Sequence, residues 1–198
     1  MIIVTGGAGF IGSNFILKFL EASNENLLNL DNLSYAANLS NLKTINTDPR
    51  YSFTKINIQN QSEVEAIVKE VKPRAILNFA AESHVDRSIE GPESFINTNI
   101  LGTYSLLEAA LNYWNDLDES GKKIFRFFHI STDEVFGSLD INDKKSTEES
   151  SYKPNSPYSA SKAASDHLVR AWHHTFKLPT LVSNCTNNYG PHQHEEKL

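Results

Sequence analysis

Short apolar segments alternate with longer amphipathic segments along most of this 198-residue chain. The short segments are rich in β-branched and aromatic residues, which favours strands. In the longer segments, apolar residues recur every three or four positions, which predicts helices that bury one face. We expect strands at residues 2–4, 27–30, 51–58, 75–79, 125–130 and 178–184. We expect helices at residues 10–22, 62–71, 92–114 and 157–176.

Strands that alternate with helices predict βαβ units, and therefore a parallel sheet. Because such crossovers are right-handed, we expect an α/β fold: a Rossmann-like, doubly wound parallel sheet with helices on both faces. The segment 138–155 is polar and rich in lysine and glutamate, which predicts a loop before the last helix.

Composition narrows the possible partners. The net charge is −6, and no basic block is present, so we expect no nucleic-acid partner. No apolar run reaches the length of a membrane span, and no basic segment of a secretory signal precedes the first strand, so we expect no membrane partner. The single cysteine, Cys185, is most simply a small core residue, and it fits a reducing, cytoplasmic setting.

A glycine-rich segment lies between the first predicted strand and the first predicted helix. Gly6, Gly9 and Gly12 form G-x-x-G-x-x-G, and Gly7, Gly9 and Gly12 also satisfy G-x-G-x-x-G. Such a loop lets the backbone and a helix N-terminus approach a pyrophosphate. Asp31 ends the second strand, where a carboxylate accepts hydrogen bonds from ribose hydroxyls and repels a 2′-phosphate. The alternative is a plain turn with an unrelated aspartate; we favour a dinucleotide site, and NAD over NADP.

Tyr158 and Lys162 are four residues apart, on one face of the last predicted helix. The alternative is a surface pair, but the fifth strand ends on Ser131 and Thr132 in a Rossmann-like chain, which favours hydride chemistry. Tyrosine has a pKa near 10, and a base at pH 7 would need roughly 4 kcal/mol of phenolate stabilisation. We expect the ammonium and a positive nicotinamide ring to supply it.

Longer sequence blocks carry a family resemblance. The first set, Thr5–Gly12 with Asp31, Thr132, Tyr158 and Lys162, resembles the extended short-chain dehydrogenase/reductase superfamily, which mostly acts on nucleotide sugars. A narrower resemblance, to the dTDP-glucose 4,6-dehydratase family, spans the whole chain. It is carried by "NFAAESHVDRSI" (78–89), "NTNILGT" (97–103), "STDEVFG" (131–137), "PNSPYSASKAASD" (154–166) and "NCTNNYGPHQHEEKL" (184–198).

The resemblance implies an internal redox reaction that removes water from dTDP-glucose. It implies that Thr132 hydrogen-bonds the sugar near O4, that Asp133 is the general acid and that Glu134 removes the C5 proton. It assigns Tyr158 and Lys162 to the oxidation step. Adjacent carboxylates raise one another's pKa, which would help to keep Asp133 protonated. Without the resemblance, the acidic pair would be read as a solvated turn.

The resemblance also implies contact residues. It assigns substrate contacts to Ser83, Thr132, Asp133, Glu134 and Asn187. It places these residues against NAD: Gly6, Gly9, Phe10, Ile11, Gly12, Asp31, Asn32, Ser34, Asn57, Ile58, Ala80, Ala81, Thr98, Tyr158, Lys162 and Asn188. Asn57 departs from the family, which usually has aspartate near the adenine, so we expect a modest change in adenine affinity.

Other polar clusters have simpler interpretations. Ser83 belongs to a charged segment after the fourth strand that contains Glu82, His84, Asp86 and Arg87, and we expect it to face the cofactor crevice. His192, His194, Glu195 and Glu196 could suggest a metal site, but such a group at a chain end is more often solvated, and we expect no metal.

The resemblance implies a homodimer in which helices 92–114 and 157–176 pair as a four-helix bundle. Family members continue well beyond residue 198, so we expect a truncated chain: an NAD-binding domain at 1–184 and the start of a substrate-binding region at 185–198. Three alternatives stay open: a nucleotide-sugar 4-epimerase, a 4,6-dehydratase for another nucleotide base, and a non-catalytic NAD-binding domain.

Overall fold

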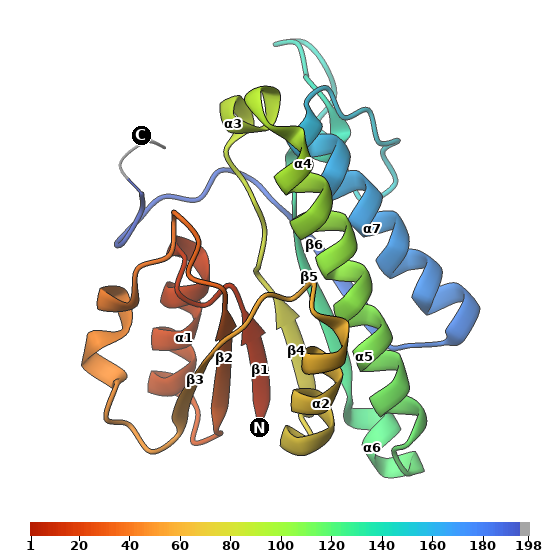
Figure 1. The fold of residues 1–198 in the computed structure, drawn as a ribbon. Coiled ribbons are helices and arrows are strands. Elements are labelled where there is room, and N and C mark those ends of the chain that lie inside the picture. Colours follow the sequence, from red (N-terminus) through yellow and green to blue (C-terminus); the bar gives the residue numbers. More distant parts are fainter. Residues whose placement is uncertain (195–198) are drawn as a thin grey trace.

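A computed structural model describes residues 1–194 and shows one parallel sheet between helices (Figure 1). The strand order is β3-β2-β1-β4-β5-β6, and every neighbouring pair is parallel. The strands are β1 (Ile2–Thr5), β2 (Leu27–Asp31), β3 (Tyr51–Lys55), β4 (Ala75–Asn78), β5 (Arg126–Thr132) and β6 (Thr180–Cys185). The order reverses between β1 and β4, where doubly wound sheets bind ligands at their carboxyl ends. The predicted fold class is confirmed.

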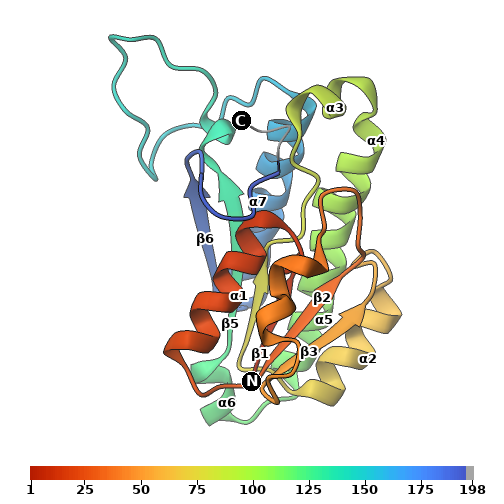
Figure 2. The same ribbon diagram turned by 90° about the vertical axis from the view of Figure 1, so that its left-hand side faces the viewer.

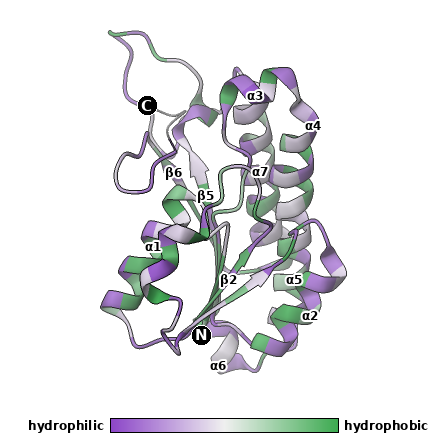
Figure 3. Ribbon diagram, turned by 60° about the vertical axis from the view of Figure 1, so that its left-hand side comes forward, coloured by the Kyte–Doolittle hydropathy of each residue, from purple (hydrophilic) through white to green (hydrophobic). Residues whose placement is uncertain are grey.

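Helices cover both faces of the sheet. The α-helices are α1 (Phe10–Ala22), α2 (Gln61–Val71), α3 (Val85–Glu90), α4 (Pro92–Phe95), α5 (Thr103–Asn115), α6 (Glu119–Ile124) and α7 (Pro157–Phe176). Three further helical segments are the 3-10 turns η1 (Leu39–Ile45) and η3 (Asp133–Phe136) and the π-helical η2 (Ile96–Gly102). The amphipathic pattern is visible in α2, which has separate hydrophobic and hydrophilic patches (Figure 3).

Successive residues of a strand pack into two separate hydrophobic cores, one on each face of the sheet. Ile3 and Ile76 belong to the core shared with α2, α5 and α7, whereas Ile2 and Leu77 belong to the core shared with α1 and η1. Side chains alternate between faces along a strand, so each short apolar run seals both layers at once. Both faces of the sheet are therefore buried, and polar groups can lie at its carboxyl edge.

Two predicted helices, α1 and α7, have the expected bounds, and capping signals explain those of α7. Ser156 and Ser159 form a capping box at the start of α7, and Pro157 occupies the first helical position. The helix ends at Lys177, which adopts a left-handed conformation with φ 64°. The start of α7 sets the position of Tyr158, one residue into the helix.

Several boundaries differ from the prediction. The third strand ends at Lys55 rather than at residue 58, because Lys55 pairs with Asp31, the last residue of β2, and no partner strand continues. The helix predicted at 92–114 is helical throughout, but its middle is π-helical. The short helices α3 and α6 were not predicted; side chains of His84 and Asp118 cap them.

The segment between η3 and α7 has no helix or strand, as predicted, and projects beyond the carboxyl edge of the sheet (Figure 2). The last strand ends at Cys185, one residue past the expected domain boundary, and the described chain continues to His194. Within residues 1–194, no helix has the length and apolar character needed to cross a membrane.

Candidate active site

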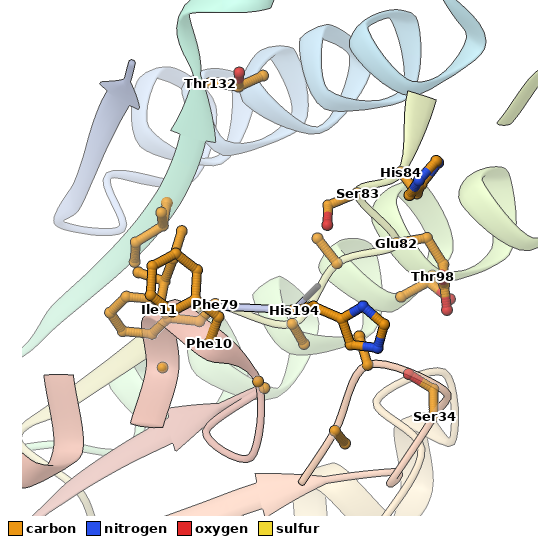
Figure 4. A pocket seen from close by; sticks show the side chains of 18 of the residues that line it. Phe10, Ile11, Ser34, Phe79, Glu82, Ser83, His84, Thr98, Thr132 and His194 are labelled. Carbon is orange, nitrogen blue, oxygen red and sulfur yellow. The ribbon is translucent and has the colours of Figure 1, made fainter. Parts of the chain in front are cut away.

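A cavity of about 610 Å³ lies at the carboxyl edge of the sheet. Its walls come from the glycine loop, the end of β2, the segment after β4, the π-helical turn η2, the end of β5, the start of α7 and the segment after β6. Figure 4 shows Thr132 on one side of this cavity and Glu82, Ser83 and His84 on another. Because parallel strands all end at this edge, residues far apart in sequence meet here.

The glycine loop requires glycine at two positions for different reasons. Gly6 has φ 69°, and a Cβ there would lie 2.6 Å from the backbone nitrogen of Ala80. A Cβ on Gly12 would collide with the carbonyl oxygen of Gly6, so α1 starts close against the loop. The loop therefore packs tightly against Phe79 and Ala80, just after β4, and its glycines Gly6, Gly9 and Gly12 line the cavity. This close approach fits a backbone cradle for a phosphate group at the start of α1.

Asp31 lies at the end of β2, with only 6 % of its surface exposed. Its Oδ2 accepts a hydrogen bond from the amide of Ala8 at 2.9 Å, and its Oδ1 accepts one from the amide of Leu33 at 2.8 Å. Burial raises the pKa of Asp31, and the two backbone donors oppose that rise. The carboxylate both braces the glycine loop and lines the cavity, where its remaining lone pairs can accept hydrogen bonds.

Tyr158 and Lys162 both line the cavity, and both are almost completely buried. Lys162 donates a 2.8 Å hydrogen bond from Nζ to the carbonyl of Ile130. Burial raises the pKa of Tyr158; the carboxylate of Glu134 raises it further, and a hydrogen bond with Thr132 opposes the rise. This direction is opposite to the expected phenolate stabilisation, because burial has the largest effect on the pKa and the nearby carboxylates add to it.

Thr132 is the last residue of β5 and directly precedes the acidic pair Asp133 and Glu134. Its Oγ1 accepts a hydrogen bond of 3.2 Å from the amide of Glu134 and thereby caps η3. Thr132 and Glu134 line the cavity. Asp133 is not part of the wall formed by residues 1–194; its Oδ1 lies 3.5 Å from Oγ1 of Thr132. Hence Thr132, Glu134 and Tyr158 are assembled together, and Asp133 stands beside them.

The loop after β4 is fixed by a residue that the sequence did not single out. Asn99, in η2, accepts a hydrogen bond from the amide of Glu82 and donates one to its carbonyl, both at 2.9 Å. Asn99 Nδ2 also donates to Ser161 Oγ at 2.8 Å. Through Asn99, the π-helical turn holds the loop that carries Ser83 against α7. π-helical turns inside α-helices often occur at functional sites.

The chain after β6 returns across the cavity to the first half of the fold. Asn14 in α1 donates a 2.7 Å hydrogen bond to the carbonyl of Pro191, and the ring of His194 lies edge-on to Tyr35, with centroids 6.0 Å apart. Arg87 covers Tyr35, with its guanidinium carbon 3.8 Å from the ring centroid. These contacts close one side of the cavity, and no local sequence signal predicted the Arg87–Tyr35 stack.

Most of the candidate residues come together. Two are absent from the cavity wall within residues 1–194, namely Asp133 and Asn57. Asn57 instead accepts a hydrogen bond from the amide of Gln59 at 3.0 Å, although both its neighbours line the cavity. Wall residues that the sequence did not identify include Tyr35, Phe79, Val85, Ile130, Cys185, Tyr189 and Gln193. No group of three or more potential metal-ligating side chains occurs in the described chain, and Glu195 and Glu196 lie outside it.

Comparisons with known proteins agree with this geometry. The family model described as GDP-mannose 4,6 dehydratase matches residues 3–198. The dTDP-glucose 4,6-dehydratase of Haemophilus influenzae is 53 % identical over 197 residues, which are 100 % of this chain and 58 % of that protein. The enzyme of the same name from Xanthomonas campestris is 54 % identical over 196 residues, which are 99 % of this chain and 55 % of that protein. This chain therefore spans less than two thirds of these relatives.

Solved structures of nucleotide-sugar enzymes share this fold. A dTDP-glucose 4,6-dehydratase from Streptomyces venezuelae, determined with NAD bound, superposes with a TM-score of 0.90 at 43 % identity, over 100 % of this chain and 59 % of that one. A UDP-glucose 4-epimerase from Thermus thermophilus, also with NAD, gives 0.83 at 29 % identity, over 98 % of this chain and 57 % of that one. With a matched family model over nearly its whole length and this fold, the chain belongs to the GDP-mannose 4,6 dehydratase family.

Proposed function

We propose that the protein carrying this chain is an NAD-dependent dTDP-glucose 4,6-dehydratase, a carbon–oxygen lyase. The observation that carries the proposal is the grouping of Thr132, Glu134 and Tyr158 on one wall of the cavity. An oxidation base and a second, separate proton acceptor are both needed when an alcohol is oxidised and an adjacent carbon is then deprotonated. The names of the relatives, at 50–54 % identity, support dTDP-glucose as the substrate.

The cavity fits NAD in shape and in donor chemistry. The tight packing at Gly6 and Gly12 leaves the start of α1 bare for a pyrophosphate, and Asp31 offers lone pairs to ribose hydroxyls. Apolar side chains of Ile11 and Ile58 line the same space and suit flat rings. When bound, NAD would supply the oxidation at sugar C4 and the later reduction at C6.

Tyr158 would take the proton from O4 during oxidation. Its pKa is raised in the protein alone, so the positive charge of the oxidised nicotinamide has to offset the nearby carboxylates. Lys162, one helical turn further along α7, would add a second positive charge. Thr132, which hydrogen-bonds Tyr158, is placed to hold the same sugar oxygen.

Glu134 would accept the proton from C5, which the C4 ketone makes acidic. Asp133 would donate a proton to the C6 hydroxyl, so that the C6–O bond breaks and water leaves. The side chain of Asp133 must turn from its position beside Thr132 to reach that hydroxyl. Reduction at C6 then yields a 4-keto-6-deoxy sugar, and the cofactor ends in its starting oxidation state.

An epimerase is the second candidate, and one observation favours it. A nucleotide-sugar 4-epimerase needs the threonine, the tyrosine and the lysine but no acid for water loss, and Asp133 does not reach the cavity wall of residues 1–194. The overlap with the epimerase from Thermus thermophilus is also extensive. Against it stands Glu134, which lines the cavity beside Tyr158 and has no task in a simple epimerisation.

The partner and location belong to the same proposal. We propose a homodimer formed by α4, η2, α5 and α7, because apolar side chains on these helices are exposed, among them Leu101 at 49 % and Phe176 at 45 %. A cytoplasmic location is supported by Cys185, a thiol on the cavity wall that a reducing compartment would keep free. Sedimentation of the protein and of Leu101→Glu tests the dimer: the variant should be monomeric at a concentration where the parent is dimeric.

Product analysis tests the proposed reaction. The protein carrying this chain is incubated separately with dTDP-glucose, UDP-glucose and GDP-mannose, and products are weighed by mass spectrometry. Loss of one water from the dTDP-sugar alone supports the proposal. An unchanged mass with an inverted C4 centre would establish the epimerase instead, and loss of water from another nucleotide sugar would correct the base. Binding of NAD without any turnover would indicate a non-catalytic NAD-binding domain.

A further inference from the structure

A buried hydrogen-bond chain runs beneath the cavity, across the three neighbouring strands β1, β4 and β5. The amide of Ala80 donates to Thr5 Oγ1 at 3.3 Å, so the Thr5 hydroxyl is left to donate to Asn78 Oδ1 at 2.7 Å. This contact orients the Asn78 amide, whose Nδ2 then lies 3.2 Å from Thr103 Oγ1 and 3.2 Å from His129 Nδ1. The chain thus starts at the cavity wall and ends on a buried imidazole.

The orientation of Asn78 assigns the tautomer of His129. Because an amide N–H points at Nδ1, that nitrogen must be the acceptor, and the ring proton is on Nε2. Nε2 lies 3.4 Å from Nζ of Lys162 and 3.4 Å from Oδ1 of Asp166. Of these two neighbours only the carboxylate can accept the Nε2 proton, because an ammonium has no acceptor, although the contact with Asp166 Oδ1 is not an aligned hydrogen bond. The imidazole therefore stands between a buried cation and a buried anion.

Asp166 is held on one side only. Its Oδ2 is close to three donors: Ser131 Oγ at 2.8 Å, Tyr152 OH at 3.0 Å and Asn184 Nδ2 at 3.4 Å. Its Oδ1 has no aligned hydrogen bond among the described residues, and its polar neighbour is His129. Only 4 % of Asp166 is exposed, and a carboxylate at that depth needs a positive charge nearby.

We propose that Asp166 is a positioning residue for Lys162: its buried carboxylate is the counter-charge that keeps the ammonium protonated, and His129, fixed as the Nε2–H tautomer, couples the two. The inference deepens the proposed function, and rests on it for the consequence that a charged Lys162 assists Tyr158. The coupling between Asp166 and Lys162 is a property of the folded chain and does not depend on which reaction the protein catalyses.

The charges around Lys162 support this assignment. The groups that face it are Asp166 from α7, the neutral ring of His129 from β5, the thiol of Cys185 from β6 and Tyr158 one turn earlier. Burial lowers the pKa of Lys162 to about 8, and Asp166, followed by Cys185, opposes that fall. Burial raises the pKa of Asp166, and Lys162 is the first group that opposes the rise. Burial, followed by Lys162, lowers the pKa of His129.

A direct titration of Lys162 tests the proposal without cofactor or substrate. The protein is labelled with ¹³Cε-lysine, and the Lys162 signal is identified by its absence in Lys162→Met. In the parent, the signal should titrate with a midpoint near 8, as burial dictates. In Asp166→Asn the midpoint should fall by about one unit or more, the usual effect of losing a nearby opposite charge. A midpoint unchanged in Asp166→Asn would overturn the proposal.

Matched variants separate charge from packing. Tyr152→Phe removes one donor to Asp166 but keeps its charge, so the Lys162 midpoint should stay within about 0.3 units of the parent, well below the charge effect. Ser131→Ala likewise removes one donor and keeps the charge, so its midpoint should also stay close to that of the parent; a fall as large as in Asp166→Asn would show that packing and not charge sets the midpoint and would overturn the proposal. If Asp166→Asn does not fold, the protonation state of His129 in the parent carries the test. ¹⁵N spectra should show neutral Nε2–H His129; Nδ1–H or a charged ring would refute the coupling.

The titration and the product analysis fail independently. A shifted midpoint in a protein that does not dehydrate dTDP-glucose would keep the Asp166–Lys162 coupling and refute the dehydratase. If the protein is active, the pH–rate profile gives a second readout. The acid-to-base equilibrium of Lys162 should appear in it at a lower pH in Asp166→Asn than in the parent, by the shift measured in the NMR titration.

Discussion

Ala8 and Asp31 are joined by a hydrogen bond of 2.9 Å that spans 23 residues of sequence, from the glycine loop to the end of the second strand. The carboxylate that we expect to contact the ribose therefore also holds the glycine loop, which is the proposed pyrophosphate site. Because Leu33 donates to the other oxygen, the carboxylate is already oriented before any ligand arrives. In the proposed NAD complex, Asp31 would couple recognition of the phosphate to recognition of the ribose.

Asp31→Asn is the test of this double role. The amide keeps one acceptor but loses the charge and places an N–H group toward Ala8 or Leu33. We expect NAD⁺ affinity to fall roughly 10–100-fold, the range for losing a hydrogen bond to a charged group. The preference over NADP⁺ should narrow, because the charge that repels the 2′-phosphate is gone. Calorimetric titration with both dinucleotides measures both effects.

Asp116→Asn is the matched control, since Asp116 is exposed at the end of α5, away from the cavity. It should leave both affinities unchanged. Equal affinity of the parent for NAD⁺ and NADP⁺ would contradict the role given to Asp31.

Tyr158→Phe should abolish oxidation at C4. The change removes the phenol that accepts the O4 proton and keeps the ring that packs edge-on against Phe95 at 6.3 Å. We expect the rate of the first half-reaction to drop by about 10²–10⁴-fold, the usual contribution of a general base. Absorbance of the reduced nicotinamide, followed after rapid mixing with dTDP-glucose, measures that step. Unimpaired reduction in the variant would move the base role to another residue.

Glu134 and Asp133 should affect different steps after the oxidation. Glu134→Gln keeps shape but cannot take the C5 proton, so oxidation should proceed and then stall, with no deuterium entering C5 from D₂O. Asp133→Asn cannot protonate the leaving hydroxyl; water loss should slow by about 10²–10⁴-fold while C5 exchange continues. Because the two act as a unit, the double variant should cost less than the sum of the single ones.

Mass spectrometry of the product, together with NMR of C5, distinguishes these outcomes. If both single variants eliminate water at the parent rate, the reason for preferring a dehydratase over an epimerase disappears. If only Asp133→Asn is silent, the acid is another group, in agreement with the position of Asp133 outside the described cavity wall.

His129 gives the fold a defined sensitivity to mild acid. Burial lowers its pKa, so the unfolded chain binds a proton below about pH 6.5, whereas the folded chain does not. The unfolded state therefore gains protons first, and stability should fall as the pH drops through that value, by about 1.4 kcal/mol per unit. His129→Gln should flatten this part of the curve between pH 7 and about pH 5.5. Chemical denaturation at several pH values measures it.

His192→Gln provides the comparison, because His192 is exposed after β6. Its profile should follow that of the parent. A parent curve that does not decline below pH 6.5 would mean that the ring of His129 is protonated in the folded state.

The pattern of apolar runs was sufficient to predict the sheet, because parallel strands buried on both faces leave little else for such runs to form. The candidate site came from the glycine motif and from the family resemblance, and the structure brings Thr132, Tyr158 and the glycine loop to one cavity because they lie at strand and helix ends on one edge of the sheet. The pattern could not predict the Asn99–Glu82 exchange or the stacking of Arg87 on Tyr35. Those contacts depend on side-chain directions that are set only when the elements have packed.

The same limit explains two of the differences from the expectations. The third strand was drawn too long because its partner ends at Asp31, a fact of pairing and not of composition. The phenol of Tyr158 was expected beside the ammonium, whereas Lys162 is turned toward Ile130 and His129. In both cases the sequence pattern predicted the strand or helix, but contacts with neighbouring elements set the end of the strand and the direction of the side chain.

The π-helical turn Ile96–Gly102 changes the direction in which the side chains after it point from the long helical stretch. Each residue turns a helix by about 100°, so the wider turn changes the rotational setting of everything after it. Within this turn, Thr98 lines the cavity and Asn99 holds the loop beside it; after the turn, Leu106 and Ala110 belong to the core. Both settings could not be met by a uniform helix, so deleting a single residue here would force the chain to choose between its binding site and its core.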